Sequence, residues 1–414
     1  MRISTSQTFA KGIEGLQNAA REIARTQEQI SSGRKLLSPA DDPVAAARIL
    51  RLSQDSALRD QYRKNIDSVK SSLGLSEAAL NQSVELLQRV QELTLQAGSG
   101  SNTRSDRQLI AVEIKQRLGE LVAIANTRSA SGEYLFGGAA SSAPPFAATA
   151  AANYAYRGDQ GQRELQIGAS LKVATTDSGY DTFVDVPSAG PTVATRADSG
   201  NDPAGNAAIS AGRVTDAAKF ATFYPASAVI TFEPLAGVTP PAVNYTVRRV
   251  ADGRIVAGLQ HVPYNGDAFI EFAGVAVQIT GNAKPGDRFV VESTGKQPVL
   301  TTLARLEEGL RTIGDAAGDQ ADLQRLLAES LTNLEAGVGT IIATRSAIGA
   351  RLNTADSTAS LHDDVELLAT RALSGLRDVD FAEAASRLSQ QSLVLQAAQQ
   401  SFVKTASLSL FALI

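Results

Sequence analysis

Apolar residues at both ends of the chain recur in alternating steps of three and four, which is the spacing of a coiled-coil seam. The N-terminal pattern, with one slot filled by glutamine, is Ile13, Leu16, Ala20, Ile23, Gln27 and Ile30. The C-terminal pattern is Phe381, Ala384, Leu388, Gln391, Leu395, Ala398 and Phe402. We therefore predict a helix at each end that packs against partner helices. The predicted assembly-interface residues are Ile13, Leu16, Ile23, Ile30, Phe381, Leu388, Leu395 and Phe402.

A break follows the first helix, because Gly33 and Pro39 both disfavour helical geometry. Asp42 then suits the N-cap of a second helix, and Pro43 suits its first position, where no helical hydrogen bond is lost. The apolar spacing predicts that this helix runs from about Pro43 to Ala97, or about 80 Å at 1.5 Å per residue. A globular domain does not need a helix of that length.

Two further helical regions flank the middle of the chain. Ser105 and Gln108 match a capping box and predict a third helix that ends near Asn126 and runs antiparallel to the second. After Pro298 the helical spacing returns, first at Leu300, Leu303, Leu306 and Leu310, and then at Leu327, Leu331, Leu334, Val338, Ile341, Ile348 and Leu352. Asp380 marks the start of the last helix.

The middle of the chain changes to short alternating runs bounded by glycine, proline and aspartate, which are typical of β-strands. The predicted strands are Arg163 to Val173, Ala228 to Phe232, Tyr245 to Val250, Phe269 to Ile279 and Arg288 to Glu292. The stretch from Pro187 to Gly212 is rich in alanine, glycine, serine and proline, and its composition predicts an irregular loop.

These elements predict an α+β multidomain fold, in which a long-helix coiled-coil bundle is built from both termini and carries an inserted β-rich domain. The predicted terminal helices are 1–42 and 380–414, which form an inner assembly domain. The predicted long-helix bundle is 43–140 and 297–379, and the β-rich outer domain is 141–296.

The terminal helices are too polar to order themselves alone. Fixing the backbone of about 35 residues costs on the order of 35–70 kcal/mol, whereas each large apolar residue returns only about 1.5–3 kcal/mol when fully buried. One hypothesis is that both ends are disordered in the monomer and fold on assembly. The alternative is that the two ends pair within one chain as an antiparallel coiled coil.

Composition narrows the classes of function. The net charge of −4 gives no reason to expect nucleic-acid or membrane binding. The chain has no cysteine, which excludes disulfides, thiolate metal sites and a cysteine nucleophile. The start lacks an apolar core of signal-peptide length and no run is long enough to span a membrane, so any export is expected to proceed without a cleaved signal.

Candidate chemistry is sparse, and we predict no enzyme, no cofactor and no metal site. The only two histidines, His261 and His362, lie in different predicted regions and are expected to be ordinary surface or loop residues. Asp41 and Asp42 suit helix capping, and Asp363 with Asp364 suits a solvated helix face. The tripeptide from Arg157 to Asp159 invites an adhesion interpretation, but Gly-Asp also fits a tight turn.

The chain resembles the flagellin superfamily at both ends. The N-terminal similarity lies in Ile30 to Arg34, Asp41 to Pro43 and Ala45 to Ala47, and the C-terminal similarity lies in Asp378 to Ala384 and the heptads after it. Within the superfamily, Ser38 to Pro43, Gly132 to Gly138 and Tyr156 to Arg163 resemble the subunits of the hook–filament junction more than filament subunits.

The resemblance implies a structural subunit of the bacterial flagellum that supports motility, polymerises at the hook–filament junction and links hook-associated protein 1 to flagellin. The alternative is an atypical flagellin. The implied partners are hook-associated protein 1, flagellin, further copies of the chain in a helical homo-oligomer, and a flagellar export chaperone. The implied location is extracellular, after unfolded export through the flagellar type III apparatus.

Overall fold

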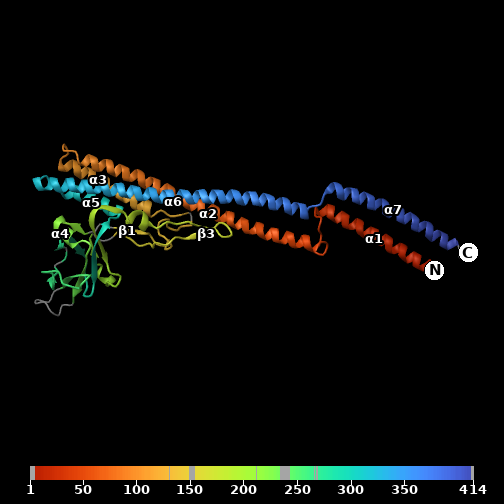
Figure 1. Ribbon diagram of the computed structural model, residues 1–414, viewed down its shortest axis with the longest axis horizontal. Helices are drawn as coiled ribbons and strands as arrows, with labels where there is room; N and C mark the ends of the chain where they lie inside the picture. Colours follow the sequence, from red (N-terminus) through yellow and green to blue (C-terminus); the bar gives the residue numbers. More distant parts are fainter. Residues whose placement is uncertain are drawn as a thin grey trace. The chain divides into compact units, whose positions relative to one another are not determined.

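The structure, a computed structural model, describes residues 5–411 apart from 130, 149–153, 211, 234–242, 265 and 267–268. It divides into two compact units. The terminal unit comprises Met1–Lys64 and Ser357–Ile414, and the central unit comprises Asn65–Asp356. Two long helices, α2 (Pro43–Ala97) and α6 (Ala317–Arg377), contribute residues to both units (Figure 1). The predicted α+β class with a β-rich middle is confirmed, whereas the division into three domains stays a prediction.

The capping predictions were right at one helix and wrong at another. Asp42 caps α2 as predicted, because its Oδ1 accepts hydrogen bonds from the N–H groups of Val44 and Ala45 at 3.1 and 2.9 Å. The capping box of α3 (Arg104–Ala125) consists of Thr103 and Asp106, two residues before the predicted pair. Thr103 and Asp106 each bond the other's backbone N–H, so Ser105 already lies inside the first turn.

Leucine-rich helix faces form the core of the helical part of the central unit. The helix α5 (Val299–Thr312) follows Pro298 as predicted and buries Leu300, Leu303, Leu306 and Leu310. The facing residues that are almost fully buried are Ile66, Val69, Leu73, Leu80 and Leu87 on α2, Ile114 and Leu121 on α3, and Leu334, Ile341 and Ile348 on α6. The three-four track of the sequence therefore predicted this core correctly.

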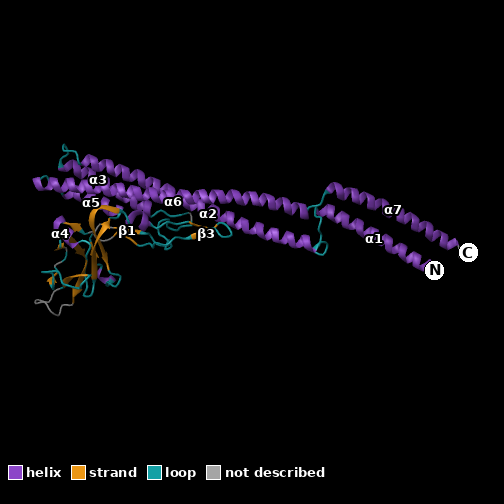
Figure 2. Ribbon diagram, in the orientation of Figure 1, coloured by secondary structure: helices purple, strands orange, loops and turns teal. Residues whose placement is uncertain are grey.

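The β-rich part contains more strands than the sequence predicted (Figure 2). Its elements are β1 (Phe146–Ala148), β2 (Tyr154–Tyr156), β3 (Glu164–Gln166), β4 (Lys172–Ala174), a π-helical turn η1 (Tyr180–Val184), β5 (Pro187–Ala197), a 3-10 turn η2 (Pro203–Gly205), β6 (Ala208–Ile209), β7 (Arg213–Val214), α4 (Ala217–Phe223), β8 (Ser227–Glu233), β9 (Asn244–Arg249), β10 (Val262–Pro263), β11 (Phe269–Phe272), β12 (Val275–Thr280) and β13 (Arg288–Lys296).

Three predictions about strands were wrong. The predicted loop from Pro187 to Gly212 contains β5, which pairs antiparallel with β13 at the edge of a sheet, where proline is tolerated. The predicted strands 163–173 and 269–279 are each a hairpin, β3 with β4 and β11 with β12. The second hairpin turns at Ala273 and Gly274, whose φ angles are 49° and 76°. Pairing with the distant strand β13 decided the first, whereas a local turn within each predicted strand decided the other two.

Two sheets enclose the core of the β-rich part. One sheet has the order β10-β9-β8-β13-β5, and the other has the order β11-β12-β6 with β7 also paired to β12. Their buried side chains form one apolar cluster that includes Phe232, Phe272 and Phe289. The ring centroids of Phe232 and Phe289 lie 5.9 Å apart in an edge-to-face arrangement.

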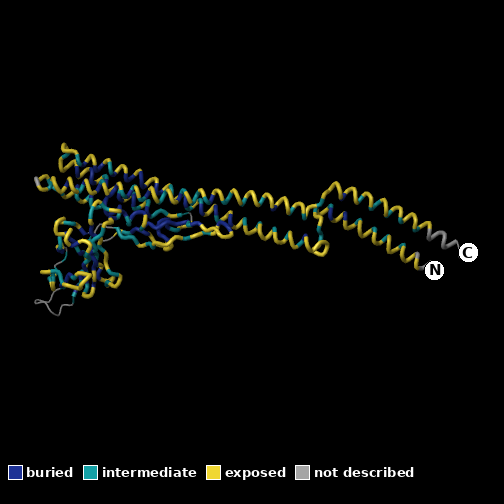
Figure 3. Tube along the Cα trace, in the orientation of Figure 1, coloured by how far each residue is buried: buried dark blue, intermediate teal, exposed yellow. Residues whose placement is uncertain are grey.

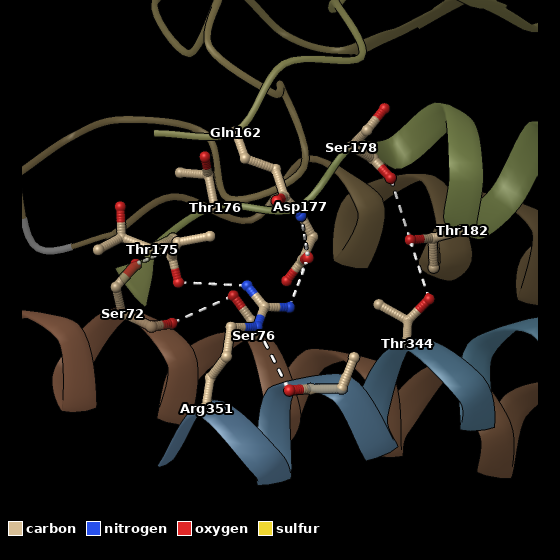
Figure 4. Close-up of polar contacts among 12 residues, drawn as sticks. Ser72, Ser76, Gln162, Thr175, Thr176, Asp177, Ser178, Thr182, Thr344 and Arg351 are labelled. Carbon is tan, nitrogen blue, oxygen red and sulfur yellow. Dashed lines mark hydrogen bonds and ion pairs between the residues drawn. The ribbon is translucent and has the colours of Figure 1, made fainter. Parts of the chain in front are cut away.

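A buried ion pair fastens the chain before β5 to the long helices of the central unit. Arg351 reaches from α6 and donates from Nη2 to Asp177 Oδ1 at 2.6 Å and from Nη1 to the carbonyl of Ala174 at 3.2 Å (Figure 4). From α2, the hydroxyl of Ser72 donates to the carbonyl of Thr175 at 2.9 Å. The Arg351 and Asp177 side chains are only 18% and 7% exposed. This pair therefore acts in a largely water-excluded position.

The turn at Gly138 requires glycine for two reasons. Its φ is +71°, and a Cβ would lie 2.3 Å from the carbonyl oxygen of Asp159. The Asp159 carboxylate in turn accepts from the backbone N–H groups of Ala139 and Gly161, which agrees with the tight-turn interpretation of this aspartate.

Gly138→Ala is expected to lower the free energy of unfolding by more than the approximately 1–2 kcal/mol that a left-handed backbone costs an ordinary residue, because the added methyl group also collides with backbone. Gly132→Ala is the matched control, since Gly132 has a φ of +84° with nothing within 4 Å of its Cβ position. Urea unfolding of the two variants measures the difference. Equal losses would show that the close approach to Asp159 is unimportant.

Candidate assembly interface

The terminal helices α1 (Thr5–Ser32) and α7 (Phe381–Phe411) pair antiparallel within the terminal unit. The ring centroids of Phe9 and Phe402 lie 4.7 Å apart near one end of the pair. Towards the other end, the hydroxyl of Thr26 donates to Gln391 Oε1 at 2.8 Å. Pairing within one chain is the second of the two possibilities that the sequence left open.

The seam of α7 follows the predicted positions and the seam of α1 is shifted. On α7, Phe381 is 58% exposed, and the other predicted positions are at least partly buried: Ala384, Leu388, Gln391, Leu395, Ala398 and Phe402. On α1, the partly or fully buried positions in three-four spacing are Gly12, Leu16, Ala19, Ile23, Thr26 and Ile30. The predicted Ile13, Ala20 and Gln27 are exposed.

The shift in α1 has a physical explanation in two small residues. Gly12 allows the Phe402 ring to approach, since a Cβ on Gly12 would lie 2.7 Å from the ring. Thr26, only 3% exposed, satisfies its hydroxyl through Gln391. Neither Gly12 nor Thr26 is a large apolar residue, so apolar spacing alone does not predict that they are buried in the seam. The exposed Ile13 lies on a strip beside the seam.

The joints that follow α1 and precede α7 are tied together by backbone hydrogen bonds. Lys35 N–H donates to the carbonyl of Arg377 at 2.7 Å, and Val379 N–H donates to the carbonyl of Gly33 at 3.0 Å. Gly33 has a φ of +69°, which a left-handed turn out of a helix requires. The position of α1 relative to α7 is therefore fixed at the joint and not by the seam alone.

Asp41 and Asp378 make the joint sensitive to acid. The pKa of Asp41 is lowered, chiefly because its carboxylate accepts the N–H of Ser38 and also pairs with Arg25. The pKa of Asp378 is lowered chiefly by a hydrogen bond from Ser374 and then by Arg377. Both carboxylates therefore stabilise the joint fully above their ordinary pKa of 3.8, and this stabilisation is lost as pH falls through the lowered values.

We expect the joint to open below about pH 3.8, before the core of the central unit unfolds. Limited proteolysis of residues 33–42 across an acid titration measures the opening. Asp41→Asn is the matched variant, because it keeps the side chain's shape and removes the charge, and it should weaken the acid dependence of cleavage. An unchanged acid profile in this variant would contradict the assignment to Asp41.

Much of the terminal unit is exposed (Figure 3), and about half of the large apolar residues that the structure describes there are exposed to solvent. Among its described residues, the buried apolar ones are Ala45, Tyr62, Ala369 and Ala384. The exposed large ones are Phe9, Ile13, Val44, Leu50, Leu58, Leu361, Val365, Leu367, Leu368, Phe381, Leu393, Val394 and Val403. An exposed apolar surface of this extent is typical of a protein–protein interface.

The described residues give little support to other kinds of site. They contain no cluster of histidine, aspartate and glutamate that could hold a metal ion. Across the same residues, no helix is long and apolar enough to cross a membrane. His362 stacks on Tyr62 with ring centroids 5.6 Å apart, and His261 pairs with Glu233 at 2.5 Å, so the two histidines do not meet.

Known proteins match this chain in sequence and in fold. The family model described as the bacterial flagellin N-terminal helical region matches residues 3–141. Flagellar hook-associated protein 3 of Salmonella typhimurium is 29% identical over 188 residues, which are 45% of this chain and 58% of that protein. The crystal structure of the flagellar junction protein FlgL from Legionella pneumophila is 28% identical, has a TM-score of 0.51, and is covered completely by 80% of this chain.

The chain is similar to flagellin-superfamily proteins in its N-terminal helical region, residues 3–141, and in its fold. Flagellin B of Vibrio anguillarum is 33% identical over 138 residues, which are 33% of this chain and 37% of that flagellin. The flagellin match is therefore shorter than the hook-associated match. The chain spans 58% of the length of the hook-associated protein it matches. The family is structural and is not a known class of enzyme.

Proposed function

We propose that this chain is a structural subunit of the bacterial flagellum that polymerises at the hook–filament junction and links hook-associated protein 1 to flagellin. The observation that carries the proposal is the terminal unit, in which about half of the large apolar side chains are exposed in a single chain. Burying each of the exposed leucines would contribute about 1.5–3 kcal/mol. Neighbouring subunits would supply that burial.

The relatives favour one of the two flagellar roles. The match to a hook-associated protein extends over 188 residues, whereas the match to a flagellin extends over 138. This difference favours the junction role. An atypical flagellin is the second candidate, supported by the higher identity within the shorter match.

A deletion strain separates the two candidates. Loss of a junction subunit should leave hooks intact and release unpolymerised flagellin into the medium, and expression of this chain should restore filaments. Loss of a flagellin should instead remove the filament protein itself. Normal filaments in the deletion strain would contradict the junction role.

Export is part of the same proposal. We infer that the chain leaves the cell unfolded through the flagellar type III apparatus, without a cleaved signal and with a chaperone that holds the terminal helices. The absence of cysteine suits a protein that functions outside the cell without disulfides. The mass of the secreted chain tests this directly, since removal of an N-terminal segment would contradict export without cleavage.

A further inference from the structure

Charged and polar residues occupy the contact between α2 and α6 in the terminal unit, where a coiled coil usually has apolar residues. Glu366 lies between the two partners, with Oε2 at 3.1 Å from Arg59 Nε and Oε1 at 2.6 Å from the hydroxyl of Ser56. The Arg59 and Glu366 side chains are 14% and 23% exposed. We call Ser56, Arg59 and Glu366 the polar layer.

A better apolar stripe lies beside this contact and faces solvent. Leu361, Val365 and Leu368 are 60%, 36% and 62% exposed and keep three-four spacing. Each of them stands one residue before a position that faces α2. Two of these inward-facing positions are Glu366 and Ala369. Rotation of α6 by about 100°, the angle between successive residues, would bury this outer stripe and expose the charge. Hydrophobicity alone favours the rotated arrangement.

The polar layer explains why the rotated or shifted arrangements are not adopted. A slip of α6 by one heptad would place Arg59 opposite Leu373 or Ala359 and leave Glu366 without its partner. Buried charges without partners are strongly unfavourable, and a polar pair in a coiled-coil contact is known to fix register. The layer therefore holds α6 in the one orientation that leaves the outer stripe uncovered.

The outward face of α2 complements the outer stripe. Leu50 and Leu58 are 61% and 49% exposed and lie eight residues apart, on the same side of the helix. The exposed Arg51 lies on this side, and the exposed Asp364 lies within the outer stripe of α6. The two surfaces thus each carry leucines, and Arg51 and Asp364 have charges of opposite sign.

We infer that the outer stripe of α6 docks onto the Leu50–Leu58 face of α2 in a second copy of this chain, with Asp364 opposite Arg51. In a head-to-tail arrangement this contact leaves one free surface of each kind, so it can propagate from copy to copy. The inference rests on the proposed function, since it names the surfaces through which one subunit contacts the next.

Cysteine crosslinking tests the contact in the full chain. The natural sequence has no cysteine, so every crosslink comes from introduced residues. A chain with both Leu58→Cys and Leu368→Cys is expressed in the deletion strain, and its flagella are isolated and oxidised. We expect a ladder of disulfide-linked copies. Asp60→Cys with Leu368→Cys is the matched control, because Asp60 is exposed on the same helix but off the leucine face, and it should remain monomeric.

Charge exchange provides the second measurement. Arg51→Asp and Asp364→Arg should each reduce the purified chain's polymer yield at least tenfold, and the double variant should recover it. If the double-cysteine chain restores filaments but forms no disulfide-linked copies, the proposed contact is wrong and the proposed function is unaffected. Failure of the double charge variant to recover would also overturn it. Failure of the unaltered chain to restore filaments would instead contradict the proposed function.

Discussion

Leu395→Asp should abolish polymerisation of the full chain while the helical core of the central unit stays folded. Leu395 is partly buried in the contact between α7 and α1, and Thr26 with Gln391 is the polar contact one turn away. The substitution removes about 1.5–3 kcal/mol of apolar burial and places a carboxylate in a partly buried, largely apolar contact. Sedimentation of polymers and thermal unfolding of the central unit measure the two effects separately.

Two further variants on α7 show which of its faces is needed for polymerisation. Gln396→Asp introduces the same charge at the next, exposed position of α7 and should polymerise normally. Leu393→Asp alters a residue that is 67% exposed in the single chain, so it should leave the α1–α7 pair intact and still prevent assembly. Normal polymerisation of Leu393→Asp would show that the outward face of α7 is not an interface.

Asp177→Ala is expected to lower the free energy of unfolding by about 3–5 kcal/mol, the range observed when one partner of a buried ion pair is removed. The loss arises because Arg351, 18% exposed, keeps its charge and loses its acceptor (Figure 4). The Gln162 side chain, which also donates to Asp177 Oδ1 at 3.2 Å, loses its acceptor too. Urea unfolding of the full chain, followed at the central unit, measures the change.

The matched control is an exposed pair of the same type. Arg196 and Glu292 lie 3.3 Å apart with side chains 63% and 43% exposed, so Glu292→Ala should change stability by about 1 kcal/mol or less. A double variant, Asp177→Ala with Arg351→Met, should regain much of the loss because no charge is left buried. Equal effects at Asp177 and Glu292 would show that burial does not strengthen the Arg351 pair.

The helical part of the fold could be predicted because the apolar spacing and the caps are local. The boundaries of α2 and α5 and the buried leucines of α5 follow from periodicity and from proline positions. The strand β5 could not be predicted in this way. Its alanine, glycine and proline give a weak local preference, and the strand exists because β13 pairs with it over most of its length.

The sequence by itself determined that both ends are helices with heptad spacing, that a β-rich segment separates them, and that the terminal helices are too polar to order themselves without a partner. The tertiary structure decided which residues face inward. Gly12 and Thr26 enter the α1 seam because of Phe402 and Gln391, which lie more than 360 residues away in the sequence. Likewise, Glu366 faces α2, where it pairs with Arg59, while Leu368 faces solvent. Periodicity predicts the spacing of the buried positions along a helix, but the partner helix determines which set of positions is buried.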